Sequence, residues 1–254
     1  MLRRLGIAFV LTARELLRRP IVLLLFFLVP AVFVSVILAV TRQTPISFQI
    51  SAIEEEDYLR VPERAEALVF IGLAAVGVLA AFVALHLAQR DSETMRRLVL
   101  CGYRPLELLA ARLGVLALTV SGIALLVAMA MALFFRPQSL ALMFVGFALL
   151  GWVYACYGLL VGTLVRQELE GVLFVALLAN LDIGWLQNPI YYAHAQQQMV
   201  IRSLPGYLPS QVAMAAAFSE HTAAEILRPA LLGFVYGAVL LLLAVLGYAR
   251  RLRA

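Results

Sequence analysis

Long apolar runs dominate the chain, and short polar segments separate them. The hydrocarbon core of a bilayer takes about 20 apolar residues per helix. Six segments meet this length, at residues 21–40, 67–88, 106–135, 140–165, 171–190 and 229–248. The pattern predicts an all-α membrane protein in which residues 1–254 form a single transmembrane domain with six spans.

The composition supports a membrane protein over a soluble one. Of the 254 residues, 64% are hydrophobic and only 14% are charged, with a mean hydropathy of +0.96. A soluble domain carries about a quarter charged residues, because it must cover its surface with polar groups. The bilayer is therefore the solvent that fits this chain.

The distribution of arginine predicts the orientation of the spans. All 20 basic residues are arginine, and the net charge is +5. Segments 1–19, 89–112, 166–170 and 250–254 hold 14 arginines in 53 residues, whereas the segments at the other ends of the spans hold 6 in 70. Positive charge is retained on the cytoplasmic side, so both termini are predicted to be cytoplasmic. The basic clusters lack interleaved aromatic residues, which excludes a nucleic-acid partner.

The first 20 residues differ from the spans. On a helix of 3.6 residues per turn, one face of residues 2–19 is apolar and the other carries most of the arginines. Such a helix lies in the plane of the membrane interface. Pro20 ends this helix and suits the first turn of the span that follows. The alternative is a basic N-terminal extension without such a role.

The outer segment 191–228 is longer than a plain connection. Its apolar stretch 211–218 is too short for a span, and Pro209-Ser210 precedes it. We expect an interfacial or re-entrant helix here. The chain then closes with the last span and a cytoplasmic tail over residues 229–254.

A short amphipathic helix is predicted between the second and third spans, within residues 89–105. Asp91 or Ser92 suits its start, and Gly102 suits its end. Met95, Leu98 and Val99 share one face at the spacing i, i+3, i+4. A helix of this kind on the cytoplasmic side presents an apolar face to a partner.

This segment resembles the cytoplasmic coupling segment of type-2 ABC exporter permeases. The residues that match in register are Thr94, Arg97, Leu98, Arg104, Pro105, Glu107, Leu108 and Leu109. Glu93 and Arg96 depart from the family, which usually has glycine and an acid at these positions. Residues 14–20 with Pro30 are similar to the N-terminal elbow of the family, and residues 204–210 to its outer helix-forming segment.

The resemblance implies the permease subunit of an ATP-driven exporter that moves an amphipathic or lipid-like solute outward across a bacterial plasma membrane. It also implies pairing with a second permease copy or a paralogue, and a separate ABC ATPase that holds ATP and Mg. The residues implied in ATPase coupling are Asp91, Glu93, Thr94, Met95, Arg97, Leu98 and Val99. Independently, a chain without lysine cannot hold a P-loop, so any ATPase activity belongs to another polypeptide and no cofactor is expected here.

Polar residues in the fourth and fifth spans are candidates for a translocation path. Asp182 lies about 17 Å along the fifth span, where an ionisable group is costly and usually functional. If that span ends early, the same residue lies in an outer vestibule. Asn180 accompanies it, and Tyr154 and Tyr157 either line the same path or serve in packing.

Other functions find less support. A haem-exporter-type permease of cytochrome maturation shares the six-span layout, and a membrane scaffold without transport is a further alternative. His86, His194 and His221 lack the spacing of a metal site, and no Gly-x-Ser-x-Gly is present, so neither metal nor catalytic residues are predicted. Gly158 and Gly162 form a Gly-x-x-x-Gly pair that arises by chance or allows close helix packing.

Overall fold

The computed structural model describes residues 2–18, 20–50, 57–89, 105–165, 167–220 and 223–253. Its elements, in chain order, are α1 (Leu2–Leu17), α2 (Pro20–Val40), β1 (Pro45–Ile50), β2 (Asp57–Pro62), α3 (Glu63–Gln89), α5 (Pro105–Ala132), α6 (Leu140–Leu164), α7 (Glu168–Leu181), the π-helical turn η1 (Asp182–Leu186), α8 (Pro189–His194), α9 (Gln198–Arg202), α10 (Tyr207–Phe218) and α11 (Ala223–Arg253).

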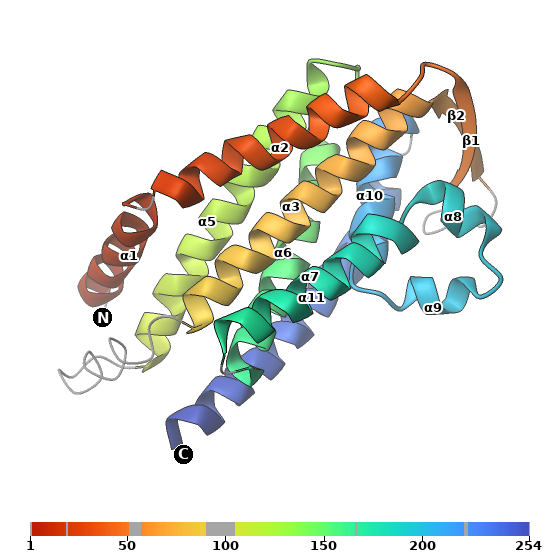
Figure 1. The fold of residues 1–254 in the computed structure, drawn as a ribbon. Coiled ribbons are helices and arrows are strands. Elements are labelled where there is room, and N and C mark those ends of the chain that lie inside the picture. The colour runs from red at the N-terminus through yellow and green to blue at the C-terminus, as the bar shows by residue number, and fades with distance from the viewer. Residues whose placement is uncertain are drawn as a thin grey trace.

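Within these ranges, six helical segments are long and apolar enough to cross a membrane. They are α2, α3, α5, α6, α7 with η1, and α11. The prediction of an all-α membrane protein with six spans is confirmed. Both termini lie at one end of the bundle, and the strands with α8 and α9 lie at the opposite end (Figure 1).

Two helices form the centre of the bundle. In the most apolar stretch of α3, 83% of the residues are buried, against 11% in α2. Helix α3 packs most extensively on α6, which also contacts α5, α10 and α11. Helices α2, α7 and α11 therefore form the periphery, and their exposed leucines, valines and phenylalanines suit contact with lipid.

Glycines on α6 allow the two central helices to approach closely. A Cβ atom at Gly158 would overlap the carbonyl oxygen of Ala81 on α3, and a Cβ atom at Gly162 would lie 2.5 Å from the Cβ of Ala88. From the sequence, the Gly158–Gly162 pair either arises by chance or allows close helix packing. In the structure it allows close packing within this chain, between α6 and α3.

Helix α1 packs against the start of α5. Ala8 and Leu16 are buried, whereas Ile7, Leu11 and Leu17 are exposed. The apolar residues of α1 are thus divided between a face that packs on the bundle and a face that remains outside it. The predicted helix is present, and its position at the membrane interface stays a prediction.

A β-hairpin forms part of the connection between α2 and α3, and the pattern of span-length apolar runs did not predict it. Strands β1 and β2 pair antiparallel, with Phe48 opposite Leu59. Phe48 and Ile50 are fully buried, and the ring of Phe48 meets Phe218 of α10 edge to face at 6.0 Å. The alternation of apolar and polar residues over 46–50 was the available signal.

The predicted outer helix is α10, and it begins at Tyr207, two residues before the Pro209-Ser210 pair expected at its start. Ten of its twelve residues are buried, and it packs on α6, α11 and α3. The loop before α6 caps the C-terminal end of α10. In this loop, Gln138 N–H and Ser139 N–H donate to the carbonyls of Ala217 and Ala216 at 3.0 and 2.9 Å. This helix is enclosed by the bundle.

Candidate functional site: a membrane-facing groove and the Asp182 network

A groove of about 390 Å³ runs between α2 and α7, with α3 as its floor. In Figure 1 the two peripheral helices lie on either side of α3. Eleven of the fourteen residues that line the groove are apolar, including Phe26, Phe82 and Val172. The groove therefore suits an apolar or amphipathic molecule.

The polar residues of the groove gather where α3 ends and α7 begins. His86 Nδ1 lies 3.8 Å from Glu168 Oε1, which joins the last turn of α3 to the first turn of α7. Gln89 Nε2 donates to the carbonyls of Gln167 at 3.3 Å and Val165 at 3.5 Å. One end of the groove is thus polar, and the remainder is apolar.

Asp182 lies in a separate, enclosed network about 15 Å farther along the fifth span from Val172. Its side chain is 0% exposed. One carboxylate oxygen, Oδ2, accepts hydrogen bonds from the hydroxyl of Tyr154 at 2.6 Å and the backbone N–H of Gly206 at 2.7 Å. The other, Oδ1, accepts from Gln187 Nε2 at 2.6 Å.

The network connects three parts of the chain that are far apart in sequence. Tyr154 belongs to α6, Asp182 begins the π-helical turn η1, and Gly206 directly precedes α10. A Cβ atom at position 206 would lie 2.8 Å from Asp182 Oδ2, so glycine is needed for this approach. The carboxylate thus fixes the entry to α10 against α6 and η1, and isolated π turns of this kind are frequent at functional sites.

Aromatic hydroxyls fix the outer segment that follows. Arg202 Nε donates to the hydroxyl of Tyr192 at 2.9 Å, and the hydroxyls of Tyr192 and Tyr207 lie 3.5 Å apart. Gln187 Nε2 also lies 3.4 Å from the carbonyl oxygen of Ile201, to which it donates. The outer segment is therefore connected by hydrogen bonds to the Asp182 network.

The structure brings two of the predicted path residues into direct contact and separates the other two. Tyr154 bonds to Asp182, whereas the hydroxyl of Tyr157 donates to the carbonyl of Phe174 at 3.3 Å. Asn180 is exposed, and its amide donates to the carbonyl of Ala176 in its own helix. A role of these four residues in translocation stays a prediction.

Sequence reasoning did not single out the other partners of this network or the groove. In the sequence, Gln187 is only a polar residue that interrupts an apolar run, and Gly206 is only part of a Pro-Gly turn. Neither pattern indicates a functional site. The groove residues belong to uniformly apolar runs, in which no position stands out. The predicted coupling residues, Asp91 to Val99, lie outside the described residues.

The described residues hold no group of three or more His, Cys, Asp or Glu side chains that could bind a metal ion. Within the same residues, six helical segments are long and apolar enough to cross a membrane, which defines a multi-pass membrane protein.

Comparison with protein families identifies the class more closely. The model of a family described as ABC-2 family transporter protein matches residues 43–246. The chain belongs to this family of membrane transporter proteins. It is therefore a transmembrane permease subunit of the ABC type, not itself catalytic, in a family that associates with ABC ATPase subunits. Comparison with curated proteins gives no match.

Proposed function

We propose that this permease belongs to an ATP-driven exporter, takes an amphipathic or lipid-like solute from the bilayer, and releases it on the outer side. A separate ABC ATPase supplies the energy by hydrolysing ATP with Mg, and a second permease copy or a paralogue completes the pathway. The family match supports the general role. The groove between α2 and α7 supports the nature of the solute and the route of entry.

The groove carries this proposal because its parts match the steps of transport. Its apolar length fits the hydrocarbon part of a solute, and His86, Gln89 and Glu168 at one end fit a polar head. Its floor, α3, leads directly into residues 90–104, which include the predicted coupling segment. Force applied to that segment by an ATPase would act on the floor of the groove. Helix α2, with few buried residues, is the wall that moves with least loss of packing.

Filling the groove tests the solute site. Val172→Trp should reduce solute-stimulated ATP hydrolysis by about tenfold in the complex of the chain with its ATPase, because the indole occupies the space of the solute. Leu173→Trp is the matched control, because Leu173 is its neighbour on α7 and is 60% exposed. Equal stimulation in wild type and Val172→Trp would contradict a solute site in this groove.

A substitution in the coupling segment tests the link to the ATPase. Leu98→Asp places a charge on the predicted apolar face, which costs a few kcal/mol if that face enters a groove of the partner. We expect complex formation, measured by co-purification, to be lost while the permease alone inserts into membranes normally. If Leu98→Asp retains full affinity for the ATPase and full stimulation, the segment does not couple the two subunits.

The orientation is tested by labelling single cysteines from outside the cell, in a background without Cys101 and Cys156. Cysteines introduced at Glu55 and Gln197 should react with a membrane-impermeant maleimide, and one at Arg96 should not. This result follows if both termini are cytoplasmic, as the distribution of arginine predicts. Strong labelling at position 96 in intact cells would reverse the orientation.

A further inference from the structure

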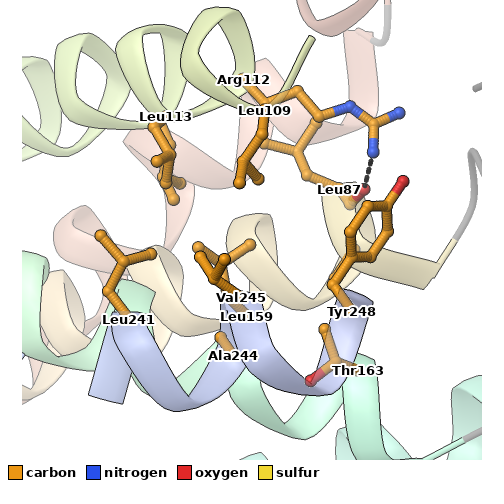
Figure 2. Close-up of a pocket in the computed structure, with 12 residues that line it drawn as sticks. Leu87, Leu109, Arg112, Leu113, Leu159, Thr163, Leu241, Ala244, Val245 and Tyr248 are labelled. Atoms are coloured by element: carbon orange, nitrogen blue, oxygen red, sulfur yellow. Dashed lines mark hydrogen bonds between the residues drawn. The ribbon is translucent and has the colours of Figure 1, made fainter. Parts of the chain in front are cut away.

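A second groove lies on another side of the bundle, between α5 and α11 (Figure 2). Leu109 and Leu113 of α5 face Leu241 and Val245 of α11 across it. Leu159 of α6 contributes to its floor. Lining residues run from Leu109 to Leu116 on one wall and from Leu241 to Tyr248 on the other, which is roughly 10 Å on each helix.

Polar side chains lie toward the end of this groove where the chain termini are found. Arg112 is the one charged residue among those that line it, and its Nη1 donates to the carbonyl of Leu87, in the last turn of α3, at 3.3 Å. This bond holds the guanidinium toward the end of the span. Tyr248 stands on the opposite wall, in the part of α11 nearest its C-terminal end, and Thr163 lies near the end of α6.

The dimensions and the charge together select the occupant. The cavity volume of this groove is only about 30 Å³, against about 390 Å³ in the groove between α2 and α7, so it is narrow and admits no bulky ring system. Its length covers about two thirds of the roughly 15 Å hydrocarbon depth of one leaflet. Guanidinium groups bind phosphate oxygens strongly, and basic pockets between transmembrane helices bind anionic headgroups.

We propose that this groove is a binding site for an anionic phospholipid of the leaflet on the side of the termini. One acyl chain lies between α5 and α11, and the phosphate of the headgroup contacts the guanidinium of Arg112. The site is distinct from the solute groove, so the proposal does not depend on the direction or the solute of transport. It requires only that the bundle spans a membrane.

Native mass spectrometry of the purified full chain tests the site, with phosphatidylglycerol and phosphatidylcholine of identical acyl chains as probes. The wild type should bind the first phosphatidylglycerol several-fold more tightly than phosphatidylcholine. Arg112→Gln should lose roughly fivefold of the affinity for phosphatidylglycerol and so lose the preference, whereas Arg112→Lys should retain most of it. Arg136→Gln is the control, because Arg136 is an exposed arginine in the loop between α5 and α6 at the opposite end of the bundle.

A second variant tests the acyl-chain part of the site. Val245→Trp should fill the groove and weaken both lipids, with the melting temperature confirming that the chain is folded. Equal binding of both lipids to the wild type, or an undiminished preference in Arg112→Gln, would overturn the proposal. If millimolar inorganic phosphate competes with phosphatidylglycerol, Arg112 binds a free anion. If Val245→Trp changes the oligomeric mass without loss of lipid, the groove binds a second copy of the chain. Either result would overturn the proposal as well.

Discussion

Replacing Gly158 with leucine should prevent the bundle from assembling. The Cβ of any larger residue at this position would overlap the carbonyl oxygen of Ala81 and lie 2.9 Å from its carbonyl carbon. Both atoms belong to the backbone of α3, so no rotamer change relieves the overlap. Ordinary overpacking costs about 1–3 kcal/mol, and displacing a central helix costs more. We expect little folded protein in detergent, measured by monodisperse yield and thermal unfolding.

Gly122→Leu is the matched control for this experiment. Gly122 is also inside a membrane-length helix, α5, but a Cβ there would meet no atom within 4 Å. This variant should fold with wild-type yield, because its leucine faces outward. If Gly158→Leu folds as well as Gly122→Leu, then α3 and α6 do not pack as closely as the structure shows.

Asp182→Ala should destabilise the chain by about 3–5 kcal/mol. The substitution removes the acceptor of three buried donors, the Tyr154 hydroxyl, the Gln187 amide and the Gly206 N–H. A buried donor without an acceptor costs about 1–3 kcal/mol, and the three costs are not fully additive. Denaturation of the purified protein in detergent measures the loss. Limited proteolysis should show cleavage in the outer segment before α10, because Gly206 loses its anchor.

Asp182→Asn separates the structural role from a role of the charge. The remaining oxygen can accept from Tyr154 and Gly206, and a flipped Gln187 amide can accept from the new N–H₂ group. We therefore expect a stability much closer to wild type than that of Asp182→Ala. Reduced transport with nearly normal stability would indicate a role of the charge in translocation. Normal transport would assign Asp182 to positioning the outer segment, and equal stability of both variants and wild type would contradict the network.

The sequence by itself determined the number of spans and their approximate places. The number and places of the spans depend only on the cost of moving polar groups into hydrocarbon. Each segment avoids this cost by its own apolar composition, independently of the other segments. The span ends were less accurate, because contacts between segments fix them. Helix α3, for example, begins at Glu63 instead of residue 67, since Glu63 N–H donates to the Thr44 carbonyl and its carboxylate accepts from the Thr44 hydroxyl.

The family could also be predicted from sequence, because residues 90–109 carry a pattern of polar residues that resembles the coupling segment of the family. Asp182 attracted attention for a similar reason, as a lone acid in an apolar span. Its partners Tyr154 and Gly206 lie 28 and 24 residues away in the chain, so only the fold could show that the carboxylate is enclosed and satisfied.

Tertiary structure alone decided which face of each span is buried. In a membrane protein, lipid-facing and core-facing positions are both apolar, so polarity along the helix does not distinguish them. The buried face is selected by the fit of small residues, as where Gly158 meets Ala81. The same reason explains the two grooves. Each groove lies between helices that do not follow one another in sequence, and the residues that line it do not stand out in the sequence. The space between these helices results only from the way they pack.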